Sequence, residues 1–188
     1  MNAAAPQCRT VTVHAFGGDR AALGRSVRKA LDDEMHGVGS GPSRLDCFLY
    51  VGHTGVSTDS GRAIYGFSPD FGGLPIWQGM QLLRNGDPLP GVVVDDTQVF
   101  VQARKHRLKV QTFDVILPQP AFQDFEQTLT AERMKSRFSY GFPDGDGDCN
   151  CTTWLERLAL PLLSGSMDEF TGLPGFSMFP RRRFGQCR

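Results

Sequence analysis

Three segments of the chain space their apolar residues three or four positions apart, which predicts three amphipathic helices. The first spans Asp19–Met35, with the carboxylate of Asp19 in place to cap its first turn. The second lies within Pro120–Phe138, and the third covers Cys151–Leu163. Pro161 has no backbone N–H, so we expect it to end or kink the third helix.

Shorter runs rich in β-branched and aromatic residues predict strands. They are Val11–Phe16, Asp46–Ser57, Arg62–Ser68, Thr97–Ala103 and Leu108–Leu117. The polar turn Thr58–Gly61 should join the second and third runs in a hairpin, and the basic run Arg104–Arg107 should join the last two. We interpret the basic run as a solvated turn, with recognition of an anionic group as the alternative. Helices that bracket an antiparallel sheet predict an α+β domain.

Length and composition fit one folded domain over residues 1–188. Hydrophobic residues make up 40% of the chain, which excludes disorder as its main description. We expect the core at about 45–163, interrupted at about 69–91 by a segment with four Pro and five Gly that we interpret as an irregular insertion. The segment 164–188 is interpreted as a tail that is rich in Gly and Pro and ends on basic residues.

Charge and hydropathy exclude several function classes. Lys+Arg and Asp+Glu number 20 each, and a net charge of zero argues against a dedicated nucleic-acid-binding protein. The sequence contains no run of about 18 apolar residues, so we expect no integral membrane segment. The first residues, MNAAAPQCRT, lack the charged and apolar regions of a Sec signal. We therefore expect cytoplasmic synthesis, with secretion by a signal-independent route left open.

Five cysteines and four histidines are candidates for metal binding or nucleophilic chemistry. An odd number of scattered cysteines does not make a complete disulfide framework, so at least one thiol should be free. Cys149 and Cys151 form a CxC pair rather than the CxxC of many zinc sites, and no two histidines have the spacing of paired ligands. We therefore expect no bound metal and no cofactor.

Cys151 is the strongest candidate for a nucleophile. It opens the third predicted helix, where unpaired backbone N–H groups and the positive end of the helix dipole favour a thiolate. The same N–H groups can stabilise an oxyanion that develops on a substrate. A buried structural cysteine is the alternative, because cysteine is among the most buried residue types. Cys149 is the second choice for the nucleophile.

His53 is the strongest candidate for the base that would accept the thiol proton. It lies in a predicted strand between the glycines of GHTGV, which leave room for another element to approach the ring. Imidazole titrates near neutral pH and suits this role. A histidine satisfied within the core is the alternative. A histidine on an antiparallel sheet together with a cysteine in the first turn of a helix is the arrangement of papain-like thiol hydrolases.

Two segments carry a resemblance to a known family. HTGVSTDSGRAIYGFSP, which begins at His53, is similar to a histidine-bearing hairpin, and NCTTW, about a hundred residues later around Cys151, is similar to a nucleophile segment. With Tyr140 shortly before it, this order resembles the circularly permuted NlpC/P60 superfamily, which includes the lecithin:retinol acyltransferase-like enzymes. The resemblance covers about 45–163. It implies a papain-like fold in which an antiparallel sheet packs against helices, with His53 as the base and Cys151 as the nucleophile.

One position departs from the pattern of that superfamily. Its acyltransferase-like members carry a third polar residue, often His, twelve positions after the first histidine, and here that residue is Tyr65. A tyrosine hydroxyl can accept a hydrogen bond from the imidazole and orient it, but it supplies no negative charge. The alternatives are that Tyr65 belongs to the core and that Ser68 orients the ring.

The resemblance implies a cysteine-dependent hydrolase of the amidase or peptidase type, with Cys151, His53 and Tyr65 as catalytic residues. The expected substrate is an amide bond, such as one in a peptidoglycan peptide or in a protein side chain. A small domain of this kind also looks like bacterial secretion-system effector toxins, which implies a cognate immunity or inhibitor protein as partner. The alternative functions are a lipid acyltransferase or thioesterase of the same fold and a non-catalytic binding module.

Overall fold

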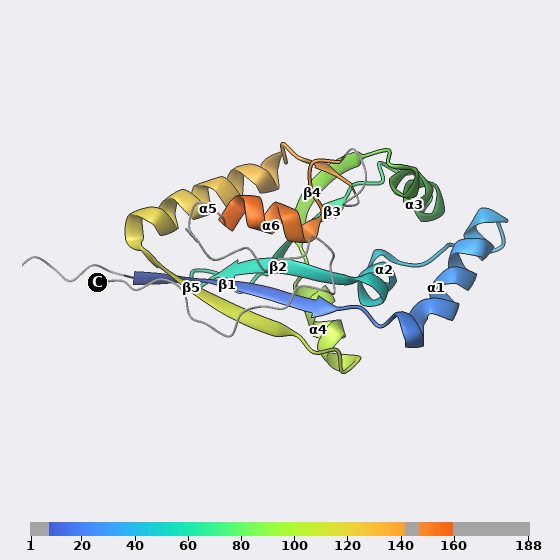
Figure 1. Cartoon of the computed structure of the whole chain (residues 1–188), viewed down its shortest axis with the longest axis horizontal. Coiled ribbons are helices and arrows are strands. Elements are labelled where there is room, and N and C mark those ends of the chain that lie inside the picture. Colours follow the sequence, from blue (N-terminus) through green and yellow to red (C-terminus); the bar gives the residue numbers. More distant parts are fainter. Residues whose placement is uncertain (1–7, 142–146, 160–188) are drawn as a thin grey trace, which may run out of the picture.

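A six-stranded antiparallel sheet forms the centre of the molecule (Figure 1). The structure is a computed structural model, and it describes residues 8–141 and 147–159. In this part of the chain the strands follow the order β5-β1-β2-β3-β4-β6. Their bounds are β1 Cys8–Gly17, β2 Gly52–Thr58, β3 Tyr65–Pro69, β4 Leu89–Asp95, β5 Gln111–Pro118 and β6 Ser139–Tyr140.

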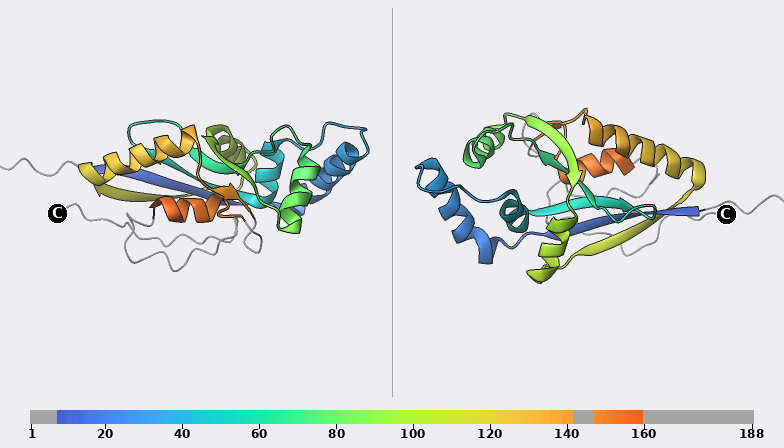
Figure 2. Two further views of the ribbon diagram at one scale, coloured as in Figure 1. Left: turned by 90° about the horizontal axis from the view of Figure 1, so that it is seen from above. Right: turned by 180° about the vertical axis from the view of Figure 1, so that it is seen from behind.

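Six helices in the described residues pack against the sheet, so the predicted α+β class is confirmed. They are α1 Arg20–Met35, α2 Arg44–Val51, α3 Ile76–Asn85, α4 Thr97–Lys105, α5 Gln119–Met134 and α6 Cys151–Ala159. Helices α5 and α6 lie on the opposite side of the long strands from α4, in the view of Figure 1 and from behind in Figure 2. Helices α1 and α3 lie together beyond one end of the sheet.

Each face of the sheet has its own hydrophobic core. The core under α5 and α6 includes Phe67, Phe122 and Trp154, and the rings of Phe67 and Trp154 stack 5.6 Å apart. The core on the other face is built around Phe100 of α4, which is fully buried. Because Phe100 packs against rings from β1 and β2, this second core sets the position of the strand that carries His53.

The three helices predicted from apolar spacing are confirmed as α1, α5 and α6. Asp19 caps α1 as expected, because its carboxylate accepts a hydrogen bond of 2.8 Å from the N–H of Ala22. The hairpin around the turn Thr58–Gly61 is confirmed as β2 and β3. The basic run Arg104–Arg107 is solvent-exposed, as predicted for a solvated segment, although it ends a helix rather than joining two strands.

The predicted strand Asp46–Ser57 is wrong in its first half, which is helix α2. Ser43 and Asp46 form a capping box: the side chain of each accepts a hydrogen bond from the backbone N–H of the other, at 3.1 Å and 2.9 Å. Gly52 then ends the helix with φ 94°, a left-handed conformation that favours glycine. A capped helix start therefore overrode the β propensity of the aromatic run.

Three further predictions are corrected. The segment 69–91 is not irregular throughout, because it contains α3 and the start of β4. The run Thr97–Ala103 is not a strand but most of α4, whose buried side chains include Val99, Phe100 and Ala103, a spacing that fits one face of a helix. The core also begins before residue 45, because β1 is a central strand of the sheet.

The remaining predictions concern membrane-spanning segments and the C-terminal part of the chain. Among the helices of the described part of the chain, none combines the length and apolar character needed to cross a bilayer. The tail 164–188 and Pro161 lie outside the described residues.

Candidate active site

Three elements bring a cysteine, a histidine and a carboxylate together. His53 is the second residue of β2, Cys151 is the first residue of α6, and Asp96 directly follows β4. The side chains of all three are buried. The Nε2 atom of His53 lies 2.7 Å from Oδ2 of Asp96, and His53 lowers the pKa of the Cys151 thiol. The two predicted residues therefore meet, and an acidic residue joins them.

The local sequence NCTT explains why α6 begins at Cys151. The side-chain oxygen of Asn150 accepts hydrogen bonds from the N–H groups of Thr152, at 2.9 Å, and Thr153, at 3.0 Å. In return the N–H of Asn150 donates to the hydroxyl of Thr153, at 2.8 Å. The cap engages these two N–H groups and not that of Cys151, which stays at the positive end of the helix beside the sulfur.

The pKa of the Cys151 thiol is lowered even though the residue is only 1% exposed. Burial raises its pKa, but the imidazole of His53 and then the hydroxyl and N–H of Thr54 lower it by more, so the net shift is downward. Cys47 and Cys149 differ, since burial raises the pKa of each to about 11. Among the free cysteines of the described residues, only Cys151 is activated.

The imidazole of His53 also favours its charged form. Burial lowers its pKa, but the carboxylate of Asp96 and the sulfur of Cys151 raise it to about 9. A carboxylate only accepts hydrogen bonds, so Nε2 is protonated and its N–H donates a hydrogen bond to Asp96. A thiol with a lowered pKa beside an imidazole with a raised pKa is the combination that favours a thiolate–imidazolium pair over the neutral pair.

Two buried polar atoms lie near the sulfur of Cys151. Nδ1 of His53 and Oγ1 of Thr54 have no partner of normal hydrogen-bond geometry among the described residues. Both side chains nevertheless shift the pKa of Cys151, so each lies within electrostatic reach of its sulfur. Nδ1 is therefore the ring nitrogen that remains available to the thiol, while Nε2 is held by Asp96.

The ring of His53 lies against two aromatic rings and close to the backbone of a neighbouring strand. It stacks on Phe48 of α2 with ring centroids 4.0 Å apart, and Phe100 lies 5.9 Å away at a tilt. A Cβ atom on Gly66 of β3 would collide with both Nε2 of His53 and Oδ2 of Asp96. A residue without a side chain is therefore required where the neighbouring strand passes this pair.

The carboxylate of Asp96 is itself fixed by a cation. Nη2 of Arg44, at the start of α2, donates to Oδ1 of Asp96 at 2.6 Å and to the hydroxyl of Ser68 at 2.9 Å. The N–H of Asp96 donates to the carbonyl of Ile64 at 2.7 Å. Each carboxylate oxygen thus has its own partner, which leaves Oδ2 for the imidazole.

Tyr65 does not take the place that the sequence suggested for it. It pairs with Val56 in the sheet, and its ring lies 4.0 Å from the guanidinium of Arg133 on α5. It precedes Gly66 and therefore points to the opposite face of β3 from the His53–Asp96 pair. Ser68 does approach the site, but it contacts Arg44 rather than the imidazole.

Sequence reasoning missed Asp96. A signal was present, because the apolar run VVV at 92–94 ends in two acidic residues. A carboxylate at the end of a predicted strand is a candidate partner for a histidine on the same sheet, yet the strand order is needed to select it. Cys149 was the second choice for the nucleophile, and its raised pKa and backbone bonds to Ser139 and Gly141 place it among structural residues.

Comparison with known proteins adds no relative to this description. No protein-family model matches the chain, and neither a curated protein nor a solved structure is similar to it at a significant level. The buried Cys151–His53–Asp96 group, in which the pKa of the thiol is lowered and that of the imidazole is raised, is therefore the basis for a proposal about its chemistry.

Proposed function

We propose that this protein is a cysteine-dependent hydrolase of the amidase or peptidase type, with Cys151 as the nucleophile, His53 as the general base and acid, and Asp96 as the residue that orients His53. The observation that carries the proposal is the buried group in which His53 lowers the pKa of the Cys151 thiol while a carboxylate lies 2.7 Å from Nε2 of the same imidazole. Buried cysteines without this surrounding, such as Cys149, have a raised pKa and would be inert.

The reaction follows from this geometry in two steps. The thiolate of Cys151 attacks the carbonyl carbon, and the electron pair of the C=O bond moves to oxygen, where the N–H of Cys151 and the hydroxyl of Thr54 can donate hydrogen bonds. As the C–N bond breaks, Nδ1–H of His53 protonates the amine, which leaves a thioester on Cys151. His53 then takes a proton from water, the hydroxide attacks the thioester, and the thiolate leaves with a carboxylic acid as product.

The finer fold assignment belongs to the same proposal. A papain-like domain of the circularly permuted NlpC/P60 type is supported by the chain order, with His53 on β2 ahead of Cys151 on α6. The sheet is antiparallel, and α6 packs on β2 and β3. On this assignment the substrate is an amide of a peptidoglycan peptide or of a protein side chain. An effector role would add an immunity or inhibitor protein as partner.

Covalent labelling by a simple activated ester tests the chemistry without knowledge of the substrate. p-Nitrophenyl acetate should give an initial burst of p-nitrophenol that is equimolar with the protein. Mass spectrometry of the intact protein should show one added acetyl group, and peptide mapping should place it on Cys151. Cys151→Ser should lose both signals, and Cys149→Ser, the matched control two residues away, should keep them. A burst that survives Cys151→Ser, or that requires Cys149, would overturn the proposal.

The amide specificity is tested in parallel with purified peptidoglycan and with a panel of peptide amides, by following newly released amino groups and ammonia. The rate should rise with pH as Cys151 ionises and fall as His53 loses its proton at about pH 9. Acetylation of Cys151 together with cleavage of thioesters and lipid esters, but of no amide, would keep the nucleophile and replace the amidase by an acyltransferase or thioesterase.

A further inference from the structure

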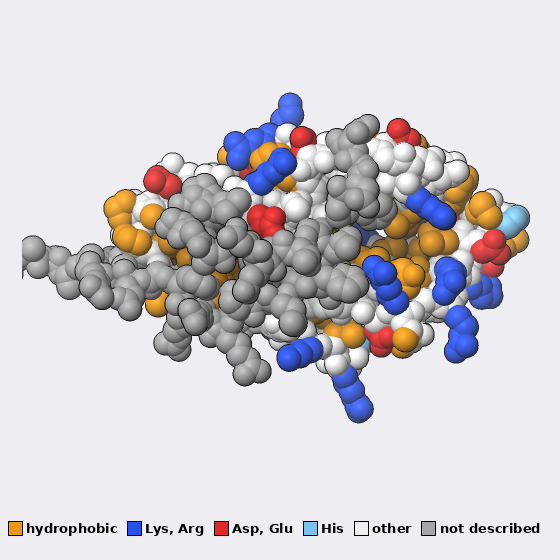
Figure 3. Space-filling model, viewed as in Figure 1, with side chains coloured by type: hydrophobic (Ala, Val, Ile, Leu, Met, Phe, Trp, Pro, Cys, Tyr) orange, Lys and Arg blue, Asp and Glu red, His pale blue; other side chains and the backbone are white. Residues whose placement is uncertain are grey.

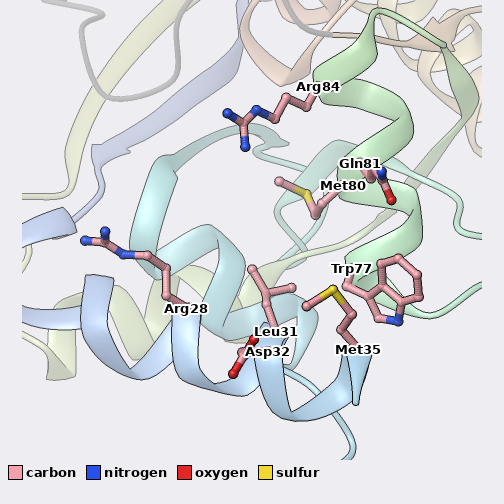
Figure 4. A pocket seen from close by; sticks show the side chains of 8 residues that line it. All are labelled: Arg28, Leu31, Asp32, Met35, Trp77, Met80, Gln81 and Arg84. Carbon is pink, nitrogen blue, oxygen red and sulfur yellow. The ribbon is translucent and has the colours of Figure 1, made fainter. Parts of the chain in front are cut away.

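A cavity lies between α1 and α3, away from the His53 site (Figure 4). Its volume is about 520 Å³, which is within the range of small-molecule sites in proteins. None of the residues that line it belongs to the group around Cys151. Figure 3 shows apolar side chains in a hollow on this side of the molecule, with basic side chains around it.

A partly buried contact joins the two walls of the cavity. The carboxylate of Glu34, near the end of α1, accepts hydrogen bonds from the N–H groups of Ile76 and Trp77, both at 3.1 Å. These are the first two residues of α3, which has no side-chain cap of its own. A carboxylate at a helix N-terminus is favourable, so Glu34 serves as the missing cap and joins α3 to α1. The cavity is therefore formed before any ligand arrives.

The walls of the cavity provide an apolar surface. Leu31 and Met35 contribute from α1, and Trp77 and Met80 contribute from α3. Met35 is 50% exposed, so part of this apolar wall is in contact with water. An apolar ligand in the cavity would cover these side chains and remove them from water.

Two arginine side chains lie at the other end of the cavity from Met35 and Trp77. Figure 4 shows the guanidinium groups of Arg28 and Arg84 at one end, with Met35 and Trp77 at the other. Neither arginine pairs with a carboxylate among the described residues, and Nε of Arg28 donates to the carbonyl of Gly24. Asp32 also lines the cavity, but its carboxylate lies 3.5 Å from the ring of His36.

We propose that this cavity binds an alkyl carboxylate, with the alkyl chain on Leu31, Met35, Trp77 and Met80 and the carboxylate between Arg28 and Arg84. Guanidinium groups match the planar geometry of a carboxylate and hold it by paired hydrogen bonds. An alkyl ligand with a neutral or cationic head group would gain only the contacts of its alkyl chain with the apolar wall. This binding site is independent of the proposed hydrolase function, because the two sites share no residue.

Decanoate, used below its micelle concentration, is the probe. The chain has two tryptophans, Trp77 in the cavity and Trp154 fully buried in the core, so the fluorescence of Trp77 should report binding. We expect saturable binding of one decanoate per chain, confirmed by calorimetry, and the same affinity in Cys151→Ser. The fluorescence change should disappear in Trp77→Phe while the calorimetric signal remains.

The double variant Arg28→Gln with Arg84→Gln should weaken decanoate binding about tenfold or more, because two charge-assisted contacts are lost. Arg25→Gln, an exposed arginine of α1 that does not line the cavity, is the matched control and should leave the affinity unchanged. Decanol should bind the native protein as weakly as decanoate binds the double variant. Equal affinity for decanol and decanoate, no effect of the double variant, or binding of an acidic peptide in place of decanoate would each overturn the proposal.

Discussion

Two buried histidines on neighbouring strands have opposite chemistry in this protein. His14 of β1 and His53 of β2 lie on the same face of the sheet, where His14 is paired with Gly55 and His53 with Phe16. Both rings approach Phe100, at 5.6 Å and 5.9 Å. Burial, with help from Arg104, lowers the pKa of His14 to about 4, whereas the pKa of His53 is raised to about 9.

The difference comes from the group that Nε2 meets. In His14 this atom contacts the hydroxyl of Ser57 at 2.8 Å, and a hydroxyl carries no charge to offset desolvation. In His53 it meets the carboxylate of Asp96. Nδ1 has no hydrogen-bond partner in either ring among the described residues, but only in His53 does it face a thiol. A buried histidine without a carboxylate at Nε2 thus has a lowered pKa and is neutral. A buried histidine with a carboxylate there has a raised pKa and is a candidate catalytic residue.

The largest effect is expected from exchanging each histidine for glutamine. In His53→Gln the pKa of Cys151 should rise, because burial still raises it and the imidazole, the main group that lowers it, is gone. The absorbance of the Cys151 thiolate in the far ultraviolet, measured as the difference from Cys151→Ser, should fall, and acetylation should slow by about a hundredfold. His14→Gln should change neither signal by more than about twofold. Equal losses in both variants would show that a general loss of structure, not the ion pair, is responsible.

Removal of the carboxylate should make His53 resemble His14. In Asp96→Asn the pKa of His53 should fall from about 9 to below its ordinary value of about 6.5, since desolvation is then the dominant influence. Asp95→Asn is the matched control, because its carboxylate caps Thr97 and does not touch the imidazole. Nuclear magnetic resonance titration of the two variants measures the shift directly. A pKa of His53 that stays near 9 in Asp96→Asn would remove Asp96 from the site.

The neutral histidine should make the fold sensitive to acid. The folded-state pKa of His14, about 4, lies below the unfolded value of about 6.5, so its contribution to stability is present above pH 6.5 and is lost as pH falls towards 4. The loss amounts to about 2–3 kcal/mol in the free energy of unfolding. Urea titrations of the native chain and His14→Gln should diverge over this interval. Parallel curves for the two proteins would contradict the assignment of His14 as a buried neutral group.

The hydroxyl that faces the sulfur should have a smaller effect. Thr54→Val keeps the shape of the side chain and removes its donor, so the pKa of Cys151 should rise and acetylation should slow by about tenfold. Thr54→Ser restores the hydroxyl and should recover most of the rate. If both variants behave alike, the hydroxyl plays no part in stabilising the charge on sulfur.

The smallest effect is expected at the residue that the sequence favoured. Tyr65→Phe removes a hydroxyl that lies on the opposite face of β3 from His53, so the acetylation rate should stay within about twofold of the native value. A loss comparable to that of Asp96→Asn would restore Tyr65 as the third catalytic residue.

Local signals in the sequence were sufficient for the elements that carry the two reactive groups. The apolar spacing predicted α6, and the position of Cys151 at its start followed from the acidic, glycine-rich loop that precedes it. The glycines around His53 suggested a close approach by other elements, and Gly66 on the next strand shows how close that approach is. Nucleophile and base were therefore predictable from residue type and local context.

Asp96 was not predictable in this way, because its role depends on contacts among β2, β3 and β4. It reaches the imidazole only because Gly66 of the intervening strand has no side chain, and because Arg44 of a helix mistaken for a strand fixes its second oxygen. Similarly, α4 was mistaken for a strand, and its Phe100 is the ring that both histidines contact. Relations between distant segments decided these cases, and spacing along the chain does not encode them.

The most direct test of the ion pair is a nuclear magnetic resonance titration of both histidine rings in the native protein, with His53→Gln and His14→Gln to assign the signals. The two rings should titrate on opposite sides of the ordinary value of about 6.5, His14 at about 4 and His53 at about 9. In Cys151→Ser the pKa of His53 should fall, because the thiolate is one of the groups that raise it. A His53 ring that loses its proton below pH 6.5, as His14 does, would contradict the thiolate–imidazolium pair and with it the proposed nucleophile.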